Sequence, residues 1–122
     1  MTPRRQRERL EDILECCEAI AQYVAEDPGL DDGIHFDATR ARVLIIGEAV
    51  SHLHSSVRAR APEVAWHEIV GMRNIVIHEY FDTAHAVVLA AAHEDVPRLK
   101  RAVRRILDVG DLDYERSPMR TD

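Results

Sequence analysis

The sequence contains few residues that interrupt helices and few that favour strands. Its 122 residues include five glycines and five prolines, and aromatic side chains make up only 5% of the chain. Alanine, leucine, glutamate and arginine, which are strong helix formers, are abundant instead. Few stretches alternate between apolar and polar residues as a half-buried strand does. These shortages predict an all-α fold.

Disulfide chemistry and membrane spans are also poorly supported. The only two cysteines, Cys16 and Cys17, are adjacent, and vicinal side chains on a helix point in directions that do not favour an ordinary disulfide. No apolar run approaches the roughly 18 residues that a membrane span needs, and no secretory apolar region lies near the first residue. We therefore expect a cytoplasmic protein with reduced thiols.

Positive charge is in short supply, with 16 Lys and Arg against 22 Asp and Glu and a formal charge of −6. Because phosphate contacts need local positive charge, a nucleic-acid role must rest on a basic patch. The run at 4–9 is expected to be a solvated helix face with ion pairs one turn apart. The run at 98–105 is the better RNA-binding candidate, because four arginines fall largely on one side with few acids among them: Arg98, Arg101, Arg104 and Arg105.

The length fits one domain, which we place at 1–110, followed by a polar tail at 111–122. The apolar spacing predicts an antiparallel bundle of about five helices, with short connections, at 3–26, 38–57, 66–81, 84–93 and 97–110. Expected helix boundaries are the N-caps Asp37, Asp82 or Thr83, and Asp95, and the closing Gly110. Pro97 is expected in the first turn of the fifth helix.

The third predicted helix carries polar residues inside an apolar run, GMRNIVIHEYF at 71–81. At about 100° per residue, one arc of it forms a core face: Ile69, Met72, Ile75 and Val76. A second apolar stripe lies almost opposite: Val70, Ile77 and Phe81. Arg73 flanks this stripe on one side with Tyr80 beside it, and Asn74 and His78 flank it on the other. A narrow apolar stripe with polar edges predicts a contact with a second subunit, where both copies would bring these groups to a shared cleft.

Plainer interpretations of these residues remain open at this point. Asn74 and His78, four residues apart, could simply hydrogen-bond each other on a solvated face. Glu48 lies in the middle of the apolar stretch VLIIGEAV at 43–50, where an unpaired carboxylate is costly. It could be partly exposed or bonded to a helix end, or it could pair with Arg73. The seven histidines show no spacing typical of a metal site with either cysteine, so no metal is expected.

Several segments together resemble the HepT-like branch of the HEPN superfamily, the toxin half of HepT/MntA toxin–antitoxin systems. These are RLEDILECCEAI at 9–20 with Tyr23, IIGEA at 45–49, APEVAWHEIVGMRNIVIHEYF at 61–81 and EDVPRLKRAV at 94–103. Residues 73–80 match the family pattern R-x-x-x-x-H-x-Y in full. The expected tryptophan of the fourth helix is missing from AHAVVLAAAH, which bears on subunit packing and not on the motif.

The resemblance implies a helical bundle that dimerises through the helix carrying the motif, and a metal-independent endoribonuclease without a cofactor. By this resemblance Arg73 and His78 are catalytic, Asn74 supports the site, and Tyr80 is the hydroxyl to which a cognate MntA-like nucleotidyltransferase antitoxin adds AMP. Glu48 is a further supporting candidate. The chemistry is reasonable, because a histidine can move protons near neutral pH and an arginine can stabilise charge on phosphate.

A function of another class remains open. The chain could be a non-catalytic helical dimer that binds a nucleotidyltransferase or a nucleotide. Such a module would tolerate the loss of Arg73 and His78, whereas a nuclease needs both of them exposed in a cleft. The sequence does not indicate which RNA is cut, or at which site.

Overall fold

The computed structural model of the chain describes residues 3–109, all of whose regular elements are helices. The elements are α1 (Pro3–Glu26), α2 (Gly33–Ser51), α3 (Ser55–Arg58), α4 (Trp66–His78), α5 (Phe81–Ala90), a π turn η1 (Ala91–Asp95) and α6 (Val96–Val109). The predicted all-α antiparallel bundle is therefore confirmed. The expected helix end at Gly110 and the polar tail at 111–122 lie outside the described residues.

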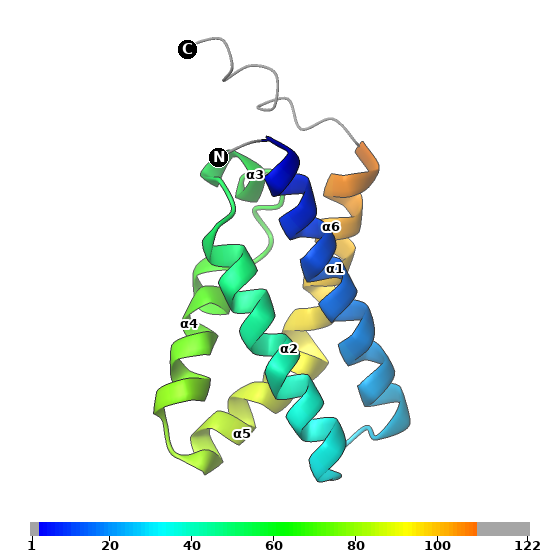
Figure 1. Cartoon of the computed structure of the whole chain (residues 1–122), viewed down its shortest axis with the longest axis vertical. Helices are drawn as coiled ribbons and strands as arrows, with labels where there is room; N and C mark the ends of the chain where they lie inside the picture. Colours follow the sequence, from blue (N-terminus) through cyan, green and yellow to red (C-terminus); the bar gives the residue numbers. More distant parts are fainter. Residues whose placement is uncertain (1–2, 110–122) are drawn as a thin grey trace.

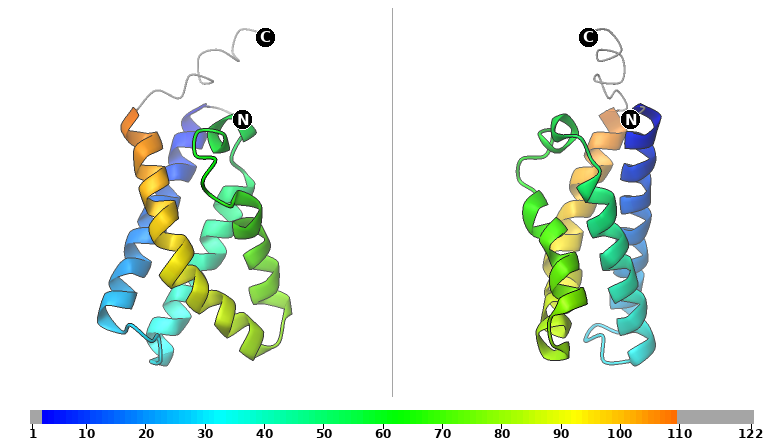
Figure 2. Two further views of the ribbon diagram at one scale, coloured as in Figure 1. Left: turned by 180° about the vertical axis from the view of Figure 1, so that it is seen from behind. Right: turned by 60° about the vertical axis from the view of Figure 1, so that its left-hand side comes forward.

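The long helices pack in two layers (Figures 1 and 2). α1 and α2 run antiparallel beside each other, and α4 packs against α2. At the foot of α4 the chain turns into α5, which continues through η1 into α6, and α6 packs along α1. This arrangement leaves α4 at one side of the molecule, where its outer surface is open.

The core is built from apolar side chains of α1, α2 and α6 together. Fully buried side chains from these helices include Leu10, Ile13, Ile20, Val43, Val50, Leu99 and Val103. Cys16 and Cys17 are buried and unbonded. Burial raises the pKa of Cys17 to about 12, so its thiol stays protonated in the folded protein.

A close approach between α2 and α4 depends on Gly47. A Cβ at this position would lie 3.1 Å from Cβ of Arg73 and 3.5 Å from the carbonyl oxygen of Ile69. Because glycine has no side chain, the backbone of α4 can pass directly over α2 at this point. The same approach brings Arg73 within reach of the next residue of α2, Glu48.

The second predicted helix begins earlier and ends earlier than expected. Its N-cap is Asp32, whose Oδ1 accepts a hydrogen bond from the backbone N–H of Ile34 at 2.8 Å. The predicted cap, Asp37, lies inside α2, so that prediction was wrong. Asp32 is favoured because the preceding turn presents it to the helix: its own N–H is held by the carboxylate of Asp27 at 2.8 Å. The helix ends at Ser51, and the one-turn α3 follows.

The predicted break at Asp95 is also wrong. α5 continues without interruption through the π turn into α6, and Pro97 lies inside that rod. A proline cannot donate the usual hydrogen bond to the carbonyl four residues back, and its ring crowds that carbonyl. A wider turn just before the proline is a known way for a helix to absorb this conflict.

Candidate active site

The motif residues gather at the C-terminal end of α4 and in the corner that follows it. Arg73, Asn74 and His78 are exposed on the helix, of which His78 is the last residue. Tyr80 lies in the two-residue corner between α4 and α5 and is 88% exposed. None of the four side chains is sequestered in the core, so all four are accessible to a partner or a substrate.

Arg73 is connected to α2 through a short polar chain. Its Nη1 lies 3.2 Å from Oε1 of Glu48, while the other carboxylate oxygen of Glu48 lies 3.0 Å from Nε2 of His52. About half of each side chain is exposed: 44% for Arg73, 52% for Glu48 and 45% for His52. Of the two interpretations left open for Glu48, both apply: it is partly exposed and it pairs with Arg73.

The environment of Glu48 keeps its carboxylate ionised. The hydrogen bond with His52 and the charge of Arg73 lower the pKa of Glu48, and Arg9 of α1 contributes to the same effect. The sequence-based reasoning did not identify His52 as a neighbour of the motif. The signal was present, because His52 follows Glu48 by four residues and therefore lies one turn away on the same helix.

The corner at Tyr80 differs from the prediction, which continued the third helix to Phe81. α4 ends at His78, so Tyr80 does not lie beside Arg73 toward the core, and Phe81 does not extend the second apolar stripe. Instead Phe81 starts α5 and its ring lies 6.1 Å from that of Phe36 and 5.4 Å from that of His85. The packing of Phe81 near Phe36, which is distant in sequence, favours the turn at this point.

The start of α5 follows from the same turn. Tyr80 occupies the N-cap position without a side-chain capping bond, and its carbonyl accepts a hydrogen bond from the N–H of Ala84 at 2.9 Å. Asp82 and Thr83, the predicted caps, therefore lie within the first turn of the helix. The two predicted caps are thus two and three residues too late.

The two faces of α4 are only partly as predicted. Ile69 and Val76 are buried, and Met72 packs against the core. Ile75, expected in the core face, is 37% exposed because it borders a groove of about 330 Å³ between α4 and the α5–η1 segment. In the second stripe Val70 packs against the core, but Ile77 is 46% exposed. Apolar side chains therefore remain open to solvent beside the motif.

Arg73 and His78 do not meet within one chain. They are five positions apart on the helix, which corresponds to about 140° around the axis and about 7.5 Å along it. Among the described residues, the Glu48 ion pair is the one polar contact made by the guanidinium of Arg73, and no polar contact is made by the His78 ring. A single copy therefore presents the two groups on different sides of the helix.

The arginine face of α6 is partly neutralised by distant acids. All four candidate arginines are exposed, but Nη2 of Arg104 lies 2.9 Å from Glu18 of α1, and Nη2 of Arg105 lies 2.8 Å from Glu63. Arg98 and Arg101 make no such ion pair within the described part of the chain. Of the four arginines of the candidate RNA-binding patch, two thus remain without an ion pair among the described residues.

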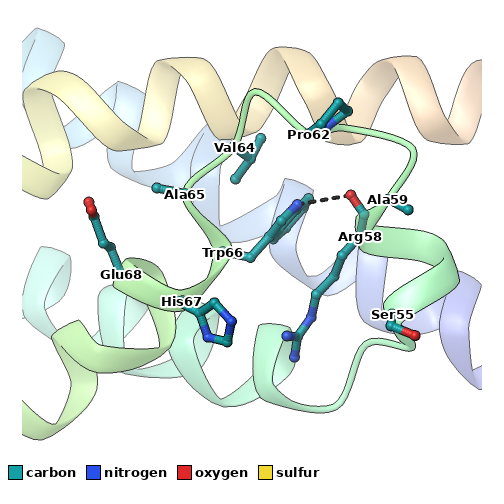
Figure 3. A pocket seen from close by; sticks show the side chains of 9 residues that line it. All are labelled: Ser55, Arg58, Ala59, Pro62, Val64, Ala65, Trp66, His67 and Glu68. Carbon is teal, nitrogen blue, oxygen red and sulfur yellow. Dashed lines mark hydrogen bonds between the residues drawn. The ribbon is translucent and has the colours of Figure 1, made fainter.

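A surface depression of about 490 Å³ lies at the opposite end of α4 (Figure 3). The ring N–H of Trp66 donates to the carbonyl oxygens of Arg58 and Ala61, both at 3.0 Å. Nη2 of Arg58 donates to the carbonyl oxygen of Val50 at 2.9 Å, at the end of α2. These bonds close the connection between α2 and α4, and we read the depression as a structural feature apart from the motif.

Residues 3–109 hold neither a metal-binding cluster nor a membrane-spanning helix. No group of three or more His, Cys, Asp or Glu side chains there is arranged to hold a metal ion. Within the same residues, every helix is too short or too polar to cross a bilayer.

Comparison with known proteins bears on what this site does. Residues 12–106 match the family described as "Ribonuclease HepT-like", which covers most of the chain and the whole R-x-x-x-x-H-x-Y motif. The chain belongs to the HepT-like family. The resemblance noted in the sequence is therefore confirmed, and with it the membership of the HEPN superfamily. Membership of this family supports a ribonuclease.

Similar proteins carry related names. The chain is 35% identical over 98 residues to "Putative RNase MJ1380" of Methanocaldococcus jannaschii, covering 77% of this chain and 89% of that protein. It is 36% identical over 111 residues to "Putative RNase TTE0752" of Caldanaerobacter subterraneus, covering 83% and 93%. It is 35% identical over 101 residues to "Probable ribonuclease HepT" of Thermococcus cleftensis, covering 80% and 91%. No solved structure gives a significant match.

Proposed function

We propose that this protein is the toxin of a toxin–antitoxin system, a homodimeric, metal-independent endoribonuclease that a nucleotidyltransferase inhibits by adding AMP to Tyr80. The observation that carries the proposal is the pair formed by Arg73 and His78, both exposed on α4 of a HepT-like chain. Family membership supports RNA as the substrate, and the dimer, the antitoxin and the mode of inhibition are our additions to it.

A dimer would resolve the separation of the two catalytic groups. Because Arg73 and His78 are about 140° apart on one helix, a cleft that uses both is most simply made where α4 meets α4 of a second copy. Exposed apolar side chains near the motif, Ile77 at 46% and Phe81 at 69%, could be buried in such a contact. A two-fold axis would then place two arginines and two histidines in one cleft.

The reaction follows from the chemistry of these side chains. One His78 would take the proton from a ribose 2′-OH, whose oxygen attacks the adjacent phosphorus. The partner's His78 would protonate the departing 5′ oxygen, so that the products are a 2′,3′-cyclic phosphate and a 5′-hydroxyl end. Arg73 would hold the phosphate and stabilise the charge that builds on its oxygens. Exposed Arg98 and Arg101 on α6 are candidates for contacts with more distant phosphates.

Inhibition through Tyr80 is consistent with its position. Its side chain is 88% exposed, in the corner that directly follows His78, so a modifying enzyme can reach it without unfolding the protein. AMP at this place adds a bulky anion next to the catalytic histidine. The anion would occupy part of the cleft and compete with RNA phosphate for Arg73.

The first experiment is cleavage of total cellular RNA by the purified dimer in EDTA, after mass spectrometry has verified that Tyr80 carries no AMP. The variants Arg73→Ala and His78→Ala are tested beside it, with His93→Ala as an exposed histidine outside the site. We expect cleavage by the wild type and His93→Ala and none by the other two. No cleavage by an unmodified dimer would favour the non-catalytic binding module instead.

A second experiment tests the shared cleft. Dimers in which one copy carries Arg73→Ala and the other His78→Ala retain one arginine and one histidine on different chains. Because such a dimer keeps one of the two histidines proposed to transfer protons, we expect it to recover only part of the activity that both parent variants lack. Mixed dimers as inactive as the parents would argue against a cleft built from both copies.

A further inference from the structure

The carboxylate of Glu48 is shared between two side chains. Oε1 lies 3.2 Å from Nη1 of Arg73, and Oε2 lies 3.0 Å from Nε2 of His52. An arginine and a free carboxylate usually form two parallel hydrogen bonds, with both oxygens engaged by one guanidinium. Here the second oxygen is already engaged by His52, and Arg73 approaches the first oxygen with its Nη1.

The backbone that carries His52 is held in place from α1. The side chain of Gln6 is completely buried; its Nε2 donates to the carbonyl oxygen of His52 at 3.2 Å, and its Oε1 accepts from the N–H of His54 at 2.9 Å. His52 also occupies the C-cap of α2, where its N–H bonds the carbonyl of Ala49. The imidazole therefore extends from a fixed point toward Glu48.

An unrestrained Glu48 would interfere with the proposed reaction. Its carboxylate is ionised and lies on α2 directly opposite Arg73, the side chain that has to hold an RNA phosphate. A bidentate pair would occupy the face of the guanidinium that recognises phosphate, because carboxylate and phosphate use the same fork of N–H donors. Complete removal of Glu48 would instead leave Arg73 without the contact that orients it.

We propose that His52 is a positioning residue of the RNA site, which holds one oxygen of Glu48 so that Glu48 orients Arg73 through the other and leaves the remaining N–H donors for phosphate. The inference rests on the proposed function, because it takes Arg73 as the phosphate ligand. His52 itself touches neither the RNA nor the reacting atoms. It acts only through Glu48, and this defines the test.

The test compares His52→Ala with His52→Gln, whose amide N–H can still donate to Glu48, and repeats both in a Glu48→Gln background. Three quantities are measured. Fluorescence anisotropy gives the Kd for a 2′-O-methyl RNA oligonucleotide, which cannot be cleaved, and cleavage assays give kcat and KM for the matching RNA. Circular dichroism and size-exclusion chromatography establish that each variant is a folded dimer. His93→Ala is the matched histidine control.

We expect His52→Ala to raise Kd and KM about tenfold, as for the loss of one charge-assisted contact, and to change kcat less than about twofold. His52→Gln should bind nearly as the wild type does. In the Glu48→Gln background, His52→Ala should have no further effect, because the competing charge is gone. A purely structural role would lower Tm without this dependence on Glu48.

Three results would overturn the inference: equal impairment by His52→Gln and His52→Ala, an undiminished effect of His52→Ala in the Glu48→Gln background, or an unchanged Kd in His52→Ala. If the wild type binds the oligonucleotide but does not cleave RNA, the proposed function fails and the binding measurements still decide the role of His52. If it binds no RNA at all, both proposals fail.

Discussion

The two ends of α4 carry polar and aromatic side chains of similar kinds but use them differently. Near the N-terminal end, Trp66 and Arg58 donate hydrogen bonds to backbone carbonyl oxygens, and these bonds hold the segment that connects α2 to α4. At the C-terminal end, His78 and Tyr80 are exposed. Although a depression of about 490 Å³ lies at the first end, the exposed groups of the motif lie at the second. Whether polar side chains are exposed or already hydrogen-bonded to the backbone is thus a better guide to function than the volume of a pocket.

The sharpest test of this contrast is His78→Ala. We expect the rate of RNA cleavage to fall by about 10²- to 10⁴-fold, the range typical for the loss of a general acid or base. The free energy of unfolding should change by less than about 0.5 kcal/mol, because the side chain is exposed and makes no polar contact within the described residues. Cleavage assays and urea denaturation measure the two quantities. A large loss of stability in His78→Ala would mean that the C-terminal end of α4 also has a structural role.

The opposite pattern is expected for Trp66. Trp66→Phe keeps an aromatic ring but leaves the carbonyls of Arg58 and Ala61 without their shared donor, which should destabilise the fold by about 1–2 kcal/mol. Trp66→Ala also leaves a cavity and should cost about 3–5 kcal/mol. Urea denaturation followed by circular dichroism measures both. At a temperature where each variant is folded, kcat should match the wild type; reduced kcat in folded Trp66→Phe would connect this end to the chemistry.

A smaller effect on activity is expected where α2 and α4 touch. Gly47→Ala places a methyl group 3.1 Å from Cβ of Arg73, which should displace the arginine and lower cleavage about tenfold. Stability should change by less than about 1 kcal/mol, because the better helix propensity of alanine offsets part of the crowding. Gly71→Ala is the control, since its added Cβ meets no atom within 4 Å. Equal activity in the two variants would show that the approach at Gly47 does not position Arg73.

The smallest effect is expected where α1 turns into α2. Nε2 of His35 lies 3.0 Å from Oε1 of Glu26, and this contact raises the pKa of His35 and lowers that of Glu26. The stabilisation from His35 is complete below its ordinary pKa of 6.5 and is lost as pH rises through the raised value. That from Glu26 is complete above its ordinary pKa of 4.5 and is lost as pH falls through the lowered value.

The excess Tm of the wild type over His35→Gln should therefore be greatest between about pH 4.5 and 6.5 and should shrink on either side. Thermal denaturation from pH 3 to pH 9 measures it. Because both groups are close to solvent, the difference should be small and should decrease in high salt. A difference that is constant across this range would mean that the pair does not contribute through its charges.

The local pattern of the sequence was enough to predict the long helices and the side chains that form their core. The 3.6-residue spacing of Leu10, Ile13 and Ile20 depends only on the local sequence of α1. In the same way, the short spacing between Arg73 and His78 that makes them a recognisable motif depends only on the local sequence of α4. Membership of the HepT-like family could be inferred for the same reason, because its motif is a contiguous stretch of α4 and the corner.

What the sequence did not reveal depends on contacts between distant residues. By its spacing in the sequence Phe81 continues the apolar stripe of Val70 and Ile77. In the structure it belongs to α5, because its ring packs near Phe36. Arg104 has Asp108 one turn further along its own helix. Its ion pair is nevertheless with Glu18, 86 residues away in sequence and beside it in the fold. The role of Glu48 could be stated only as two alternatives, since its distance to Arg73 depends on how closely α4 crosses Gly47.

The π turn before Pro97 sets the rotational phase of everything that follows it. A π turn accommodates one residue more than an α-turn, and each residue of an α-helix advances by about 100°. Without that extra residue, α6 would start about 100° out of phase, turning Leu99 and Val103 away from the core and moving Arg98 and Arg101 off the outer surface. The number of residues in η1 therefore determines which side of α6 faces the core. A one-residue deletion there would rotate all the apolar and basic side chains of α6 together.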